Sequence, residues 1–340
     1  MKAEIGKLEM NKKKIDLKSL TSSREMSLVV VLAVLCIFIQ LRNSIFLTPS
    51  NIGDMLINAS LMAILAIGMM CVLLIGGIDI SIGSTVALSG MATALVMRDN
   101  PGIPAFLGFL IAILVGLAAG FIIGLVIAKG RVIPIIATLG FMNIYRGITY
   151  LIANNQWVAA YQIPENYKAF TLGKTFGINN MLIVTVICYL VFAYFIKYTR
   201  TGRKIYAVGS NSEAAAVSGI NIANVKIMVY SLMGALCGLV GGLWVSKYAS
   251  AQGDSAKGFE MDIIAACVIG GVSLTGGKGT VFGVILGSLT LGILNNALPL
   301  INVSSFWQDA IKGLIIIAAV ILNTVTQRAM DKNNLKRREM

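Results

Sequence analysis

The sequence lacks histidine altogether. Histidine is the usual acid–base group near neutral pH and the commonest metal ligand. Its absence excludes catalytic triads built on histidine and metal sites with histidine ligands. The five cysteines stand singly within apolar stretches, without the paired spacing of a metal or redox site. We interpret them as small buried apolar residues, and no metal site is predicted.

Charge is also scarce. Charged residues make up 13% of the chain, against roughly 25% in soluble domains. In contrast, 57% of the residues are hydrophobic and the mean hydropathy is +0.82. A soluble domain of this size cannot hide that much apolar surface from water. The composition therefore excludes a soluble enzyme and a disordered chain, and it predicts an all-α, polytopic membrane protein.

Apolar runs of about 20 residues, the length that crosses a bilayer, recur along the chain. We expect about ten transmembrane helices, some of them broken at glycine-rich points. These spans form a membrane domain over 27–326, with polar tails at 1–26 and 327–340. The expected spans are 27–41, 56–75, 81–97, 103–128, 132–152, 178–198, 227–249, 262–275, 280–298 and 308–326.

The net charge of +13 has a topological explanation. With the N-terminal tail in the cytoplasm and ten alternating spans, 20 Lys and Arg residues fall on the cytoplasmic side and 6 on the other. Such a bias is typical of the positive-inside rule, so both termini are expected in the cytoplasm. Because the basic residues flank apolar runs rather than forming a polar face, membrane lipid is an expected partner and nucleic acid is not.

Two loops between the spans are long enough to carry a function. The outward loop 153–177 contains Trp157, Tyr161 and Tyr167, which suit an aromatic belt at the membrane interface. The inward loop 199–226 predicts a short helix with Ser212 as its N-cap and Gly219 at its end. That helix is either an ordinary surface helix or a docking element for a cytoplasmic partner.

The 35 glycines follow a pattern. Small residues repeated every four positions let two membrane helices approach closely, so three sets of glycines predict close helix packing. The sets are Gly116, Gly120 and Gly124; Gly234, Gly238 and Gly242; and Gly283 with Gly287.

Two glycine-rich segments also echo each other: IGGIDISIGS at 75–84 and IGGVSLTGGK at 269–278. Paired, glycine-interrupted apolar segments are typical of broken helices at the translocation site of a transporter. The sequence GGKGT at 276–280 is not a phosphate-binding P-loop, because Val272 and Gly279 stand where glycine and Ser/Thr are required. An ATPase that drives transport is therefore expected on a separate chain.

Ionisable residues within the membrane are costly and mark candidate sites. Asp79 either caps the helix that begins near Ser81, pairs with Arg146, or contacts the solute. Lys312 is expected to extend toward a membrane face. Asparagines in apolar spans suit a hydroxyl-rich neutral solute or hydrogen bonds between helices. The residues predicted at helix breaks or along a translocation pathway are Gly76, Gly77, Asp79, Ser81, Ser84, Asn143, Arg146, Asn295 and Asn296.

Several long motifs, in order over residues 50–325, resemble the permease subunits of bacterial ABC importers for ribose, arabinose, xylose and galactosides. The ribose-type permeases look most similar. The motifs are GGIDISIGS (76–84), AKGRVIPIIATLG (128–140), TRTGRKIYAVGSNSEAAAVSGIN (199–221), VYSLMGALCGL (229–239), and a stretch from Ala265 to Asn296 that contains IGGVSLTGGKGT and LGILNN.

This resemblance implies a permease domain over 27–326 in the bacterial plasma membrane. It implies a second permease subunit in a homodimer or heterodimer, two cytoplasmic ABC ATPases, and an extracytoplasmic sugar-binding protein. Under it, ATP binds the partner ATPase, this chain holds no cofactor and is not an enzyme, and a monosaccharide crosses by alternating access.

The segment EAAAVSG at 213–219 resembles the EAA-xxx-G coupling motif of ABC permeases. The resemblance places Glu213 and Gly219 in a short helix that fits a groove on the ATPase. The motif's downstream I-x-L-P is missing, since no proline occurs between Pro164 and Pro299. The expected ATPase-coupling residues are Arg200, Gly202, Arg203, Glu213, Ala214, Ala215 and Gly219.

Two other classes of function are weighed against this one. An ion-coupled secondary transporter would also contain broken helices, and Asp79 is its one candidate ion-binding carboxylate. An intramembrane enzyme would need a catalytic constellation, and the sequence offers no histidine, metal-ligand spacing or paired membrane carboxylates.

Overall fold

The computed structural model describes residues 24–304, 306–308, 310–315, 317–318 and 321. The regular structure of these residues is α-helical, apart from a 3-10 turn at Ala160–Gln162 and one β-hairpin. The hairpin pairs two strands of two residues each, β1 (Lys174–Thr175) and β2 (Ile178–Asn179). The predicted tail 327–340 lies outside the described residues, as does most of the tail 1–26 and much of the expected span 308–326.

Six helices of the described part are long and apolar enough to cross a membrane. This confirms an all-helical, polytopic membrane protein. The six are α3 (Pro49–Leu74), α5 (Ala105–Ala128), α6 (Pro134–Ile152), α8 (Asn180–Tyr198), α11 (Ile222–Tyr248) and α13 (Val281–Leu300). Three further helices coincide with expected spans: α2 (Arg24–Arg42), α4 (Ile82–Asp99) and α12 (Phe259–Ile269).

Helix α12 has 11 residues and rises only ~16 Å at 1.5 Å per residue. That is about half of the ~30 Å hydrocarbon layer. The expected span 262–275 is therefore a short helix that stops at Gly270, where the second glycine-rich segment begins. Beside it, Lys312 Nζ lies 3.9 Å from Asp262 Oδ2, an ion pair in place of the predicted extension toward a membrane face.

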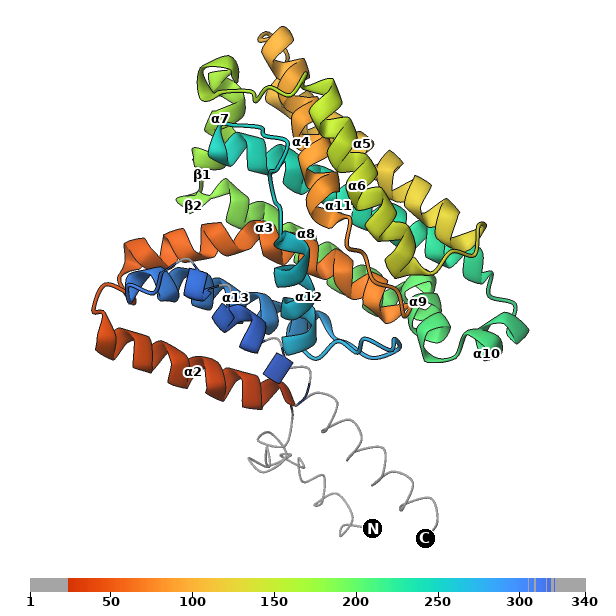
Figure 1. Cartoon of the computed structure of the whole chain (residues 1–340). Coiled ribbons are helices and arrows are strands. Elements are labelled where there is room, and N and C mark those ends of the chain that lie inside the picture. The colour runs from red at the N-terminus through yellow and green to blue at the C-terminus, as the bar shows by residue number, and fades with distance from the viewer. Residues whose placement is uncertain (1–23, 305, 309, 316, 319–320, 322–340) are drawn as a thin grey trace, which may run out of the picture.

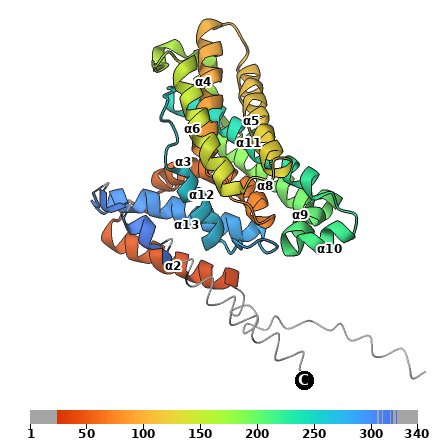
Figure 2. The ribbon, with the colours of Figure 1, turned by 45° about the vertical axis from the view of Figure 1, so that its right-hand side comes forward.

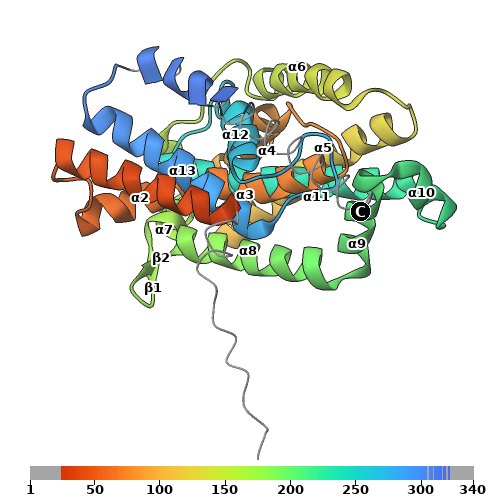
Figure 3. The same ribbon diagram turned by 90° about the horizontal axis from the view of Figure 1, so that it is seen from below.

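The helices form two groups joined by α3 and α11. Helices α4, α5, α6 and α11 pack together, and α2, α12 and α13 gather with α3 (Figures 1 and 2). Figure 3 places α6 and α8 at opposite edges of the bundle. Within it, α3 is buried without interruption from Ala59 to Leu74.

The predicted close packing of glycine-bearing helices is confirmed. A Cβ on Gly116 of α5 would overlap the Gly234 carbonyl oxygen of α11, and a Cβ on Gly234 would overlap the Gly116 carbonyl in return. Likewise, a Cβ on Gly287 of α13 would overlap the Ala266 carbonyl of α12. Backbones therefore meet directly at these crossings, where dispersion contacts hold helices together in the absence of water.

Candidate functional site

The two glycine-rich segments that echo each other in sequence lie against each other in space. The backbone N–H of Gly277 donates to the carbonyl of Leu74 at 2.9 Å. A Cβ on Gly276 would stand 3.0 Å from the backbone nitrogen of Gly76. Gly276 and Gly277 have φ of 91° and 72°, a left-handed conformation that favours glycine. The break after α3 and the break after α12 thus form one structural unit.

The end of α9 (Arg200–Ser210) enters the same contact. A Cβ on Gly209 would overlap the Leu74 carbonyl oxygen and lie 2.7 Å from the Gly277 nitrogen. One turn earlier, the Tyr206 hydroxyl donates to the Gly279 carbonyl at 2.7 Å. We call the three touching segments, residues 74–76, 209–210 and 275–277, the glycine junction. It joins the loop 199–226 directly to both helix breaks.

A polar cavity of about 450 Å³ opens beside the glycine junction, and its lining includes Gly76, Gly209 and Thr275 together with Glu213 and Lys226. Lys226 lies near the first turns of α11. A second cavity, described below, lies just beyond the last residue of that helix. Since 22 residues of helix rise ~33 Å, the two cavities mark opposite ends of the bundle.

The loop 199–226 holds two helices, α9 and α10, where one was predicted. Helix α10 (Ser212–Val217) confirms the short helix, and it ends before Gly219, whose φ is 80°. Its N-cap is Asn211, whose side-chain oxygen accepts from the Ala214 N–H at 2.9 Å, so the assignment of Ser212 as N-cap is wrong by one residue. Helix α9 was missed. Its sequence signals are the Thr199 cap, which accepts from Gly202 N–H, and the buried pair Ile205 and Val208.

Helix α10 presents most of its surface to solvent. Glu213, Ala214 and Gly219 are exposed, and the exposed fraction of Val217 is 91%. Ala215 is buried beneath them. In α9, Arg200 and Arg203 are exposed, whereas Gly202 is buried in the turn from α8. Ala215 and Gly202, both expected to contact an ATPase, therefore face the protein interior.

Asp79 lies at the start of α4, as the capping interpretation predicts, but it bonds to Ser81, the N-cap residue, and not to an N–H of the helix itself. Its Oδ1 accepts from the Ser81 N–H at 2.8 Å and from the Ser81 hydroxyl at 2.6 Å, at the start of α4. Ser84 donates to the Ser81 carbonyl at 2.8 Å. All three residues are buried, and Gly77 beside them packs against the Tyr230 side chain. These hydrogen bonds join residues close in sequence, and they stabilise the conformation of the first helix break, residues 76–84.

The predicted alternative in which Arg146 pairs with Asp79 is wrong. Arg146 Nη1 donates instead to the carbonyls of Gly253 and Ser255, at 2.7 and 2.9 Å. These acceptors are backbone atoms in the segment that follows α11. Arg146 thus fastens α6 to the segment after α11 rather than to the first break.

The three predicted asparagines have different surroundings. Asn296 exchanges two side-chain amide hydrogen bonds with Asn51, each 3.0 Å, joining α13 to α3. Asn295 keeps a buried Oδ1 that accepts no hydrogen bond from the described part of the chain. Asn143 is exposed on α6 and donates to the Leu139 carbonyl of its own helix. Of the three, only Asn143 lies on the exposed surface of the helix bundle.

At the opposite end of the bundle the predicted aromatic belt is partly wrong. Trp157 and Tyr161 are exposed at 67% and 87%. Tyr167 is fully buried, and its hydroxyl donates to the Gly242 carbonyl at 3.1 Å. Tyr167 therefore anchors α7 (Glu165–Leu172) to α11 instead of lying at an interface.

Comparison with known proteins agrees with this architecture. Residues 51–320 match the family described as branched-chain amino acid transport system / permease component. The ribose import permease protein RbsC of Escherichia coli K12 is 38% identical over 306 residues, covering 89% of this chain and 94% of that protein. RbsC of Bacillus subtilis 168 is 36% identical over 292 residues, covering 86% and 90% respectively. The L-arabinose ABC transporter permease protein AraH of Azospirillum brasilense is 33% identical over 296 residues, covering 87% and 86%.

No solved structure matches the chain. The matches confirm the resemblance carried by the sequence motifs, and they favour a non-enzymatic transport subunit over the ion-coupled and enzymatic alternatives. The chain belongs to the branched-chain amino acid transport system / permease component family, as a multi-pass transmembrane subunit of an ABC importer.

Proposed function

We propose that the chain forms the membrane pathway of an ATP-driven importer for a monosaccharide such as ribose. The observation that carries this proposal is the similarity to ribose import permeases over nearly the whole chain. Transport of a neutral sugar also suits the polar residues at the candidate sites, which are mainly serines and asparagines. ATP would bind separate ATPase subunits, and an extracytoplasmic protein would deliver the sugar.

For the topology we propose about ten spans, with both termini in the cytoplasm of the bacterial cell. The end of the bundle that holds α9 and α10 carries exposed Arg200, Arg203 and Lys204. A concentration of basic residues at one end follows the positive-inside rule. That end would face the cytoplasm, and the loops that contain Trp157 and Gly253 would face outward.

Helix α10 is the proposed docking element for the ATPase. It stands at the cytoplasmic end with an acidic residue, Glu213, and an apolar residue, Val217, both exposed. In a docked complex Val217 would supply an apolar contact, and Glu213 would be a charged group at the rim that attracts a basic partner surface. Helix α9 connects α10 to the glycine junction. A displacement of α10 would therefore move α9 and, through its backbone contacts, both helix breaks.

Alternating access would follow from movement at the glycine junction. Three backbone segments touch there without side chains between them, and tightly packed contacts of this kind shift between discrete arrangements rather than deforming gradually. When the ATPases close, displacement of α9 would alter the breaks at 76–84 and 270–279 together. Asp79, Ser81 and Ser84 would keep the first break intact during this movement.

The exposed face of α6 is the proposed contact with the second permease subunit. No heavy atom lies within 4 Å of a Cβ built on Gly140 or Gly147, and Asn143 between them is exposed. Residues three and four apart share one helix face. Small residues with a polar neighbour are typical of interfaces between membrane helices. The pathway would run along this face, between the two subunits, with Asn143 beside it.

A charge reversal at α10 tests the proposed docking. Glu213→Arg is expected to abolish copurification of the partner ATPase and ATP-dependent sugar uptake, while the protein keeps its elution profile in detergent. Glu165→Arg is the matched control, because Glu165 has a side-chain exposure of 91% at the opposite end. Normal ATPase binding by the Glu213→Arg variant would refute the docking assignment.

A further inference from the structure

An open cleft of about 640 Å³ lies at the end of the bundle opposite the glycine junction. Its two walls are the segment after α6, residues 153–162, and the segment after α11, residues 250–256. The backbones of Val158 and Ala251 exchange two hydrogen bonds, of 2.9 and 3.1 Å, and tie the walls together. Two loops that are about 90 residues apart in the chain thus form the cleft together.

Two side chains of α6, Arg146 and Tyr150, contact the wall that follows α11. Arg146 donates to the carbonyls of Gly253 and Ser255 at 2.7 and 2.9 Å, and hydrogen bonds from a charged donor are stronger than neutral ones. Gly253 packs directly against the Tyr150 ring, since a Cβ there would overlap the ring carbons. The cleft is therefore preformed, and it sits directly on the helix proposed to line the pathway.

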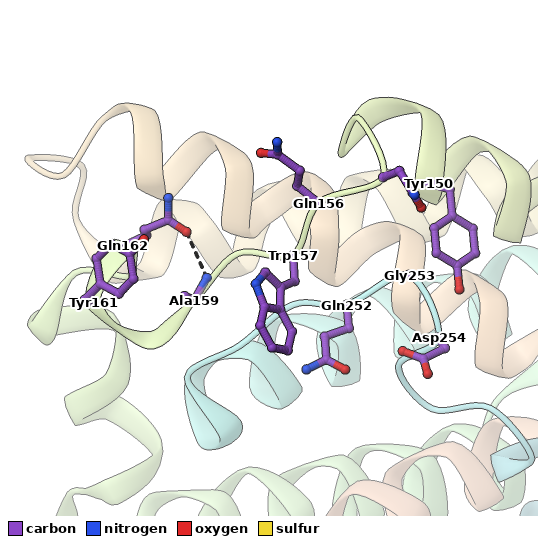
Figure 4. Close-up of a pocket in the computed structure, with 10 residues that line it drawn as sticks. Tyr150, Gln156, Trp157, Ala159, Tyr161, Gln162, Gln252, Gly253 and Asp254 are labelled. Carbon is purple, nitrogen blue, oxygen red and sulfur yellow. Dashed lines mark hydrogen bonds between the residues drawn. The ribbon is translucent and has the colours of Figure 1, made fainter.

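The lining combines aromatic rings with planar polar groups. Trp157 is 67% exposed, Tyr150 is 39% exposed, and the side chains of Gln252 and Asp254 stand nearby. In Figure 4 the Trp157 ring and the Gln252 side chain point to the same side of the loops, while Gln156 points away. Among the residues that the structure describes, the lining contains no lysine or arginine.

This chemistry selects an uncharged polyhydroxylated ligand. The apolar C–H face of a sugar ring packs on an exposed indole, whose body is apolar and flat. An amide offers both donor and acceptor, and a carboxylate accepts from two neighbouring hydroxyls. Anionic ligands are disfavoured, because the exposed Asp254 repels them and the neighbouring Arg146 is already engaged with the Gly253 and Ser255 carbonyls.

We propose that this cleft is a sugar-binding site at the outer mouth of the pathway, where Trp157, Gln252 and Asp254 hold a neutral monosaccharide before it passes along α6. The identity of the ligand rests on the proposed function. The site is open and shallow, so little of the ligand is desolvated, and binding would be weak, with a dissociation constant on the order of millimolar.

Intrinsic fluorescence tests the site on the purified full-length chain in lipid nanodiscs. Trp244→Phe combined with Trp307→Phe leaves Trp157 as the only tryptophan. Ribose is expected to change its fluorescence with saturation in the millimolar range. Gln252→Ala and Asp254→Asn should each weaken the half-saturation at least about fivefold, which corresponds to ~1 kcal/mol. Ribose 5-phosphate, which is anionic, should have no effect.

Saturation-transfer NMR of ribose on the unmodified chain gives a second reading that does not depend on the tryptophan substitutions. The proposal is overturned if the response is absent or unsaturable, or if Gln252→Ala and Asp254→Asn leave it unchanged. It is also overturned if Trp157→Ala abolishes binding of the extracytoplasmic protein with no sugar response in either assay, because the cleft is then a protein docking surface. ATP-driven uptake measured in parallel distinguishes these failures from failure of the transport function.

Discussion

Gly209 is the point at which the loop that carries α10 touches both helix breaks. A Cβ at this position would overlap the Leu74 carbonyl and crowd the Gly277 nitrogen, two atoms joined by a 2.9 Å hydrogen bond. Overpacking of this kind destabilises by ~1–3 kcal/mol, and loss of the backbone hydrogen bond adds ~0.5–1.5 kcal/mol. Gly209→Ala should therefore disfavour the observed junction by about 1.5–4.5 kcal/mol, or at least about tenfold in population.

The assay is sugar uptake into proteoliposomes that contain the chain with its ATPase, beside ATP hydrolysis and ATPase copurification. Gly209→Ala is expected to lower uptake at least tenfold while ATPase binding persists, since α10 itself is unchanged. Gly53→Ala is the matched control, because no heavy atom lies within 4 Å of a Cβ built there.

A second variant distinguishes a specific effect on the glycine junction from a general loss of folding. Tyr206→Phe deletes only the hydroxyl that donates to the Gly279 carbonyl. Burial, and to a smaller extent the neighbouring Cys71, raises the pKa of this phenol, so it stays a donor throughout the neutral range. Tyr206→Phe should lower uptake severalfold with little change in thermal stability. Uptake at the level of the unmodified chain in both Gly209→Ala and Tyr206→Phe would refute the role of the glycine junction.

Three further outcomes are expected. Gly234→Leu should separate α5 from α11 and lower the midpoint of thermal unfolding by several degrees, since bulk at a backbone contact costs ~1–3 kcal/mol; an unchanged midpoint would argue against the close crossing. Arg146→Gln should free the loop after α11 and speed its cleavage by a protease added from outside, whereas equal cleavage rates would contradict the anchoring role. Asp79→Asn keeps an oxygen acceptor for Ser81 and should retain ATP-driven uptake; loss of uptake with Asn would instead favour an ion-binding carboxylate. Asp79→Leu leaves the buried N–H and hydroxyl of Ser81 without this acceptor and should lose ~1–3 kcal/mol of stability.

Periodic features were predicted well from the sequence. Apolar runs indicated the positions of the long helices, because they depend on local repeats. Glycines at four-residue spacing indicated that α5, α11 and α13 each pack closely on another helix, but not which helix that is. The contact between Asp79 and Ser81 is close to one of the three alternatives that the sequence left open, and it is local, since the acceptor and the donor are two residues apart.

Contacts between distant segments were not predicted. The echo of the two breaks was visible, but their meeting with Gly209 involves backbone atoms, which leave no signature in side-chain identity. Arg146 was misassigned for the same reason, because its acceptors are carbonyl oxygens that any residue supplies. Tyr167 resembles an interfacial aromatic in a polar loop, and only the fold brings the Gly242 carbonyl to its hydroxyl.

The central claim is that this chain passes a monosaccharide under the control of a separate ATPase. The most direct measurement is accumulation of radiolabelled ribose in proteoliposomes that contain the chain, with the partner ATPase and sugar-binding protein added in turn. The account predicts accumulation only when both partners and hydrolysable ATP are present, independent of proton and sodium gradients. Accumulation driven by an ion gradient without the ATPase would contradict it.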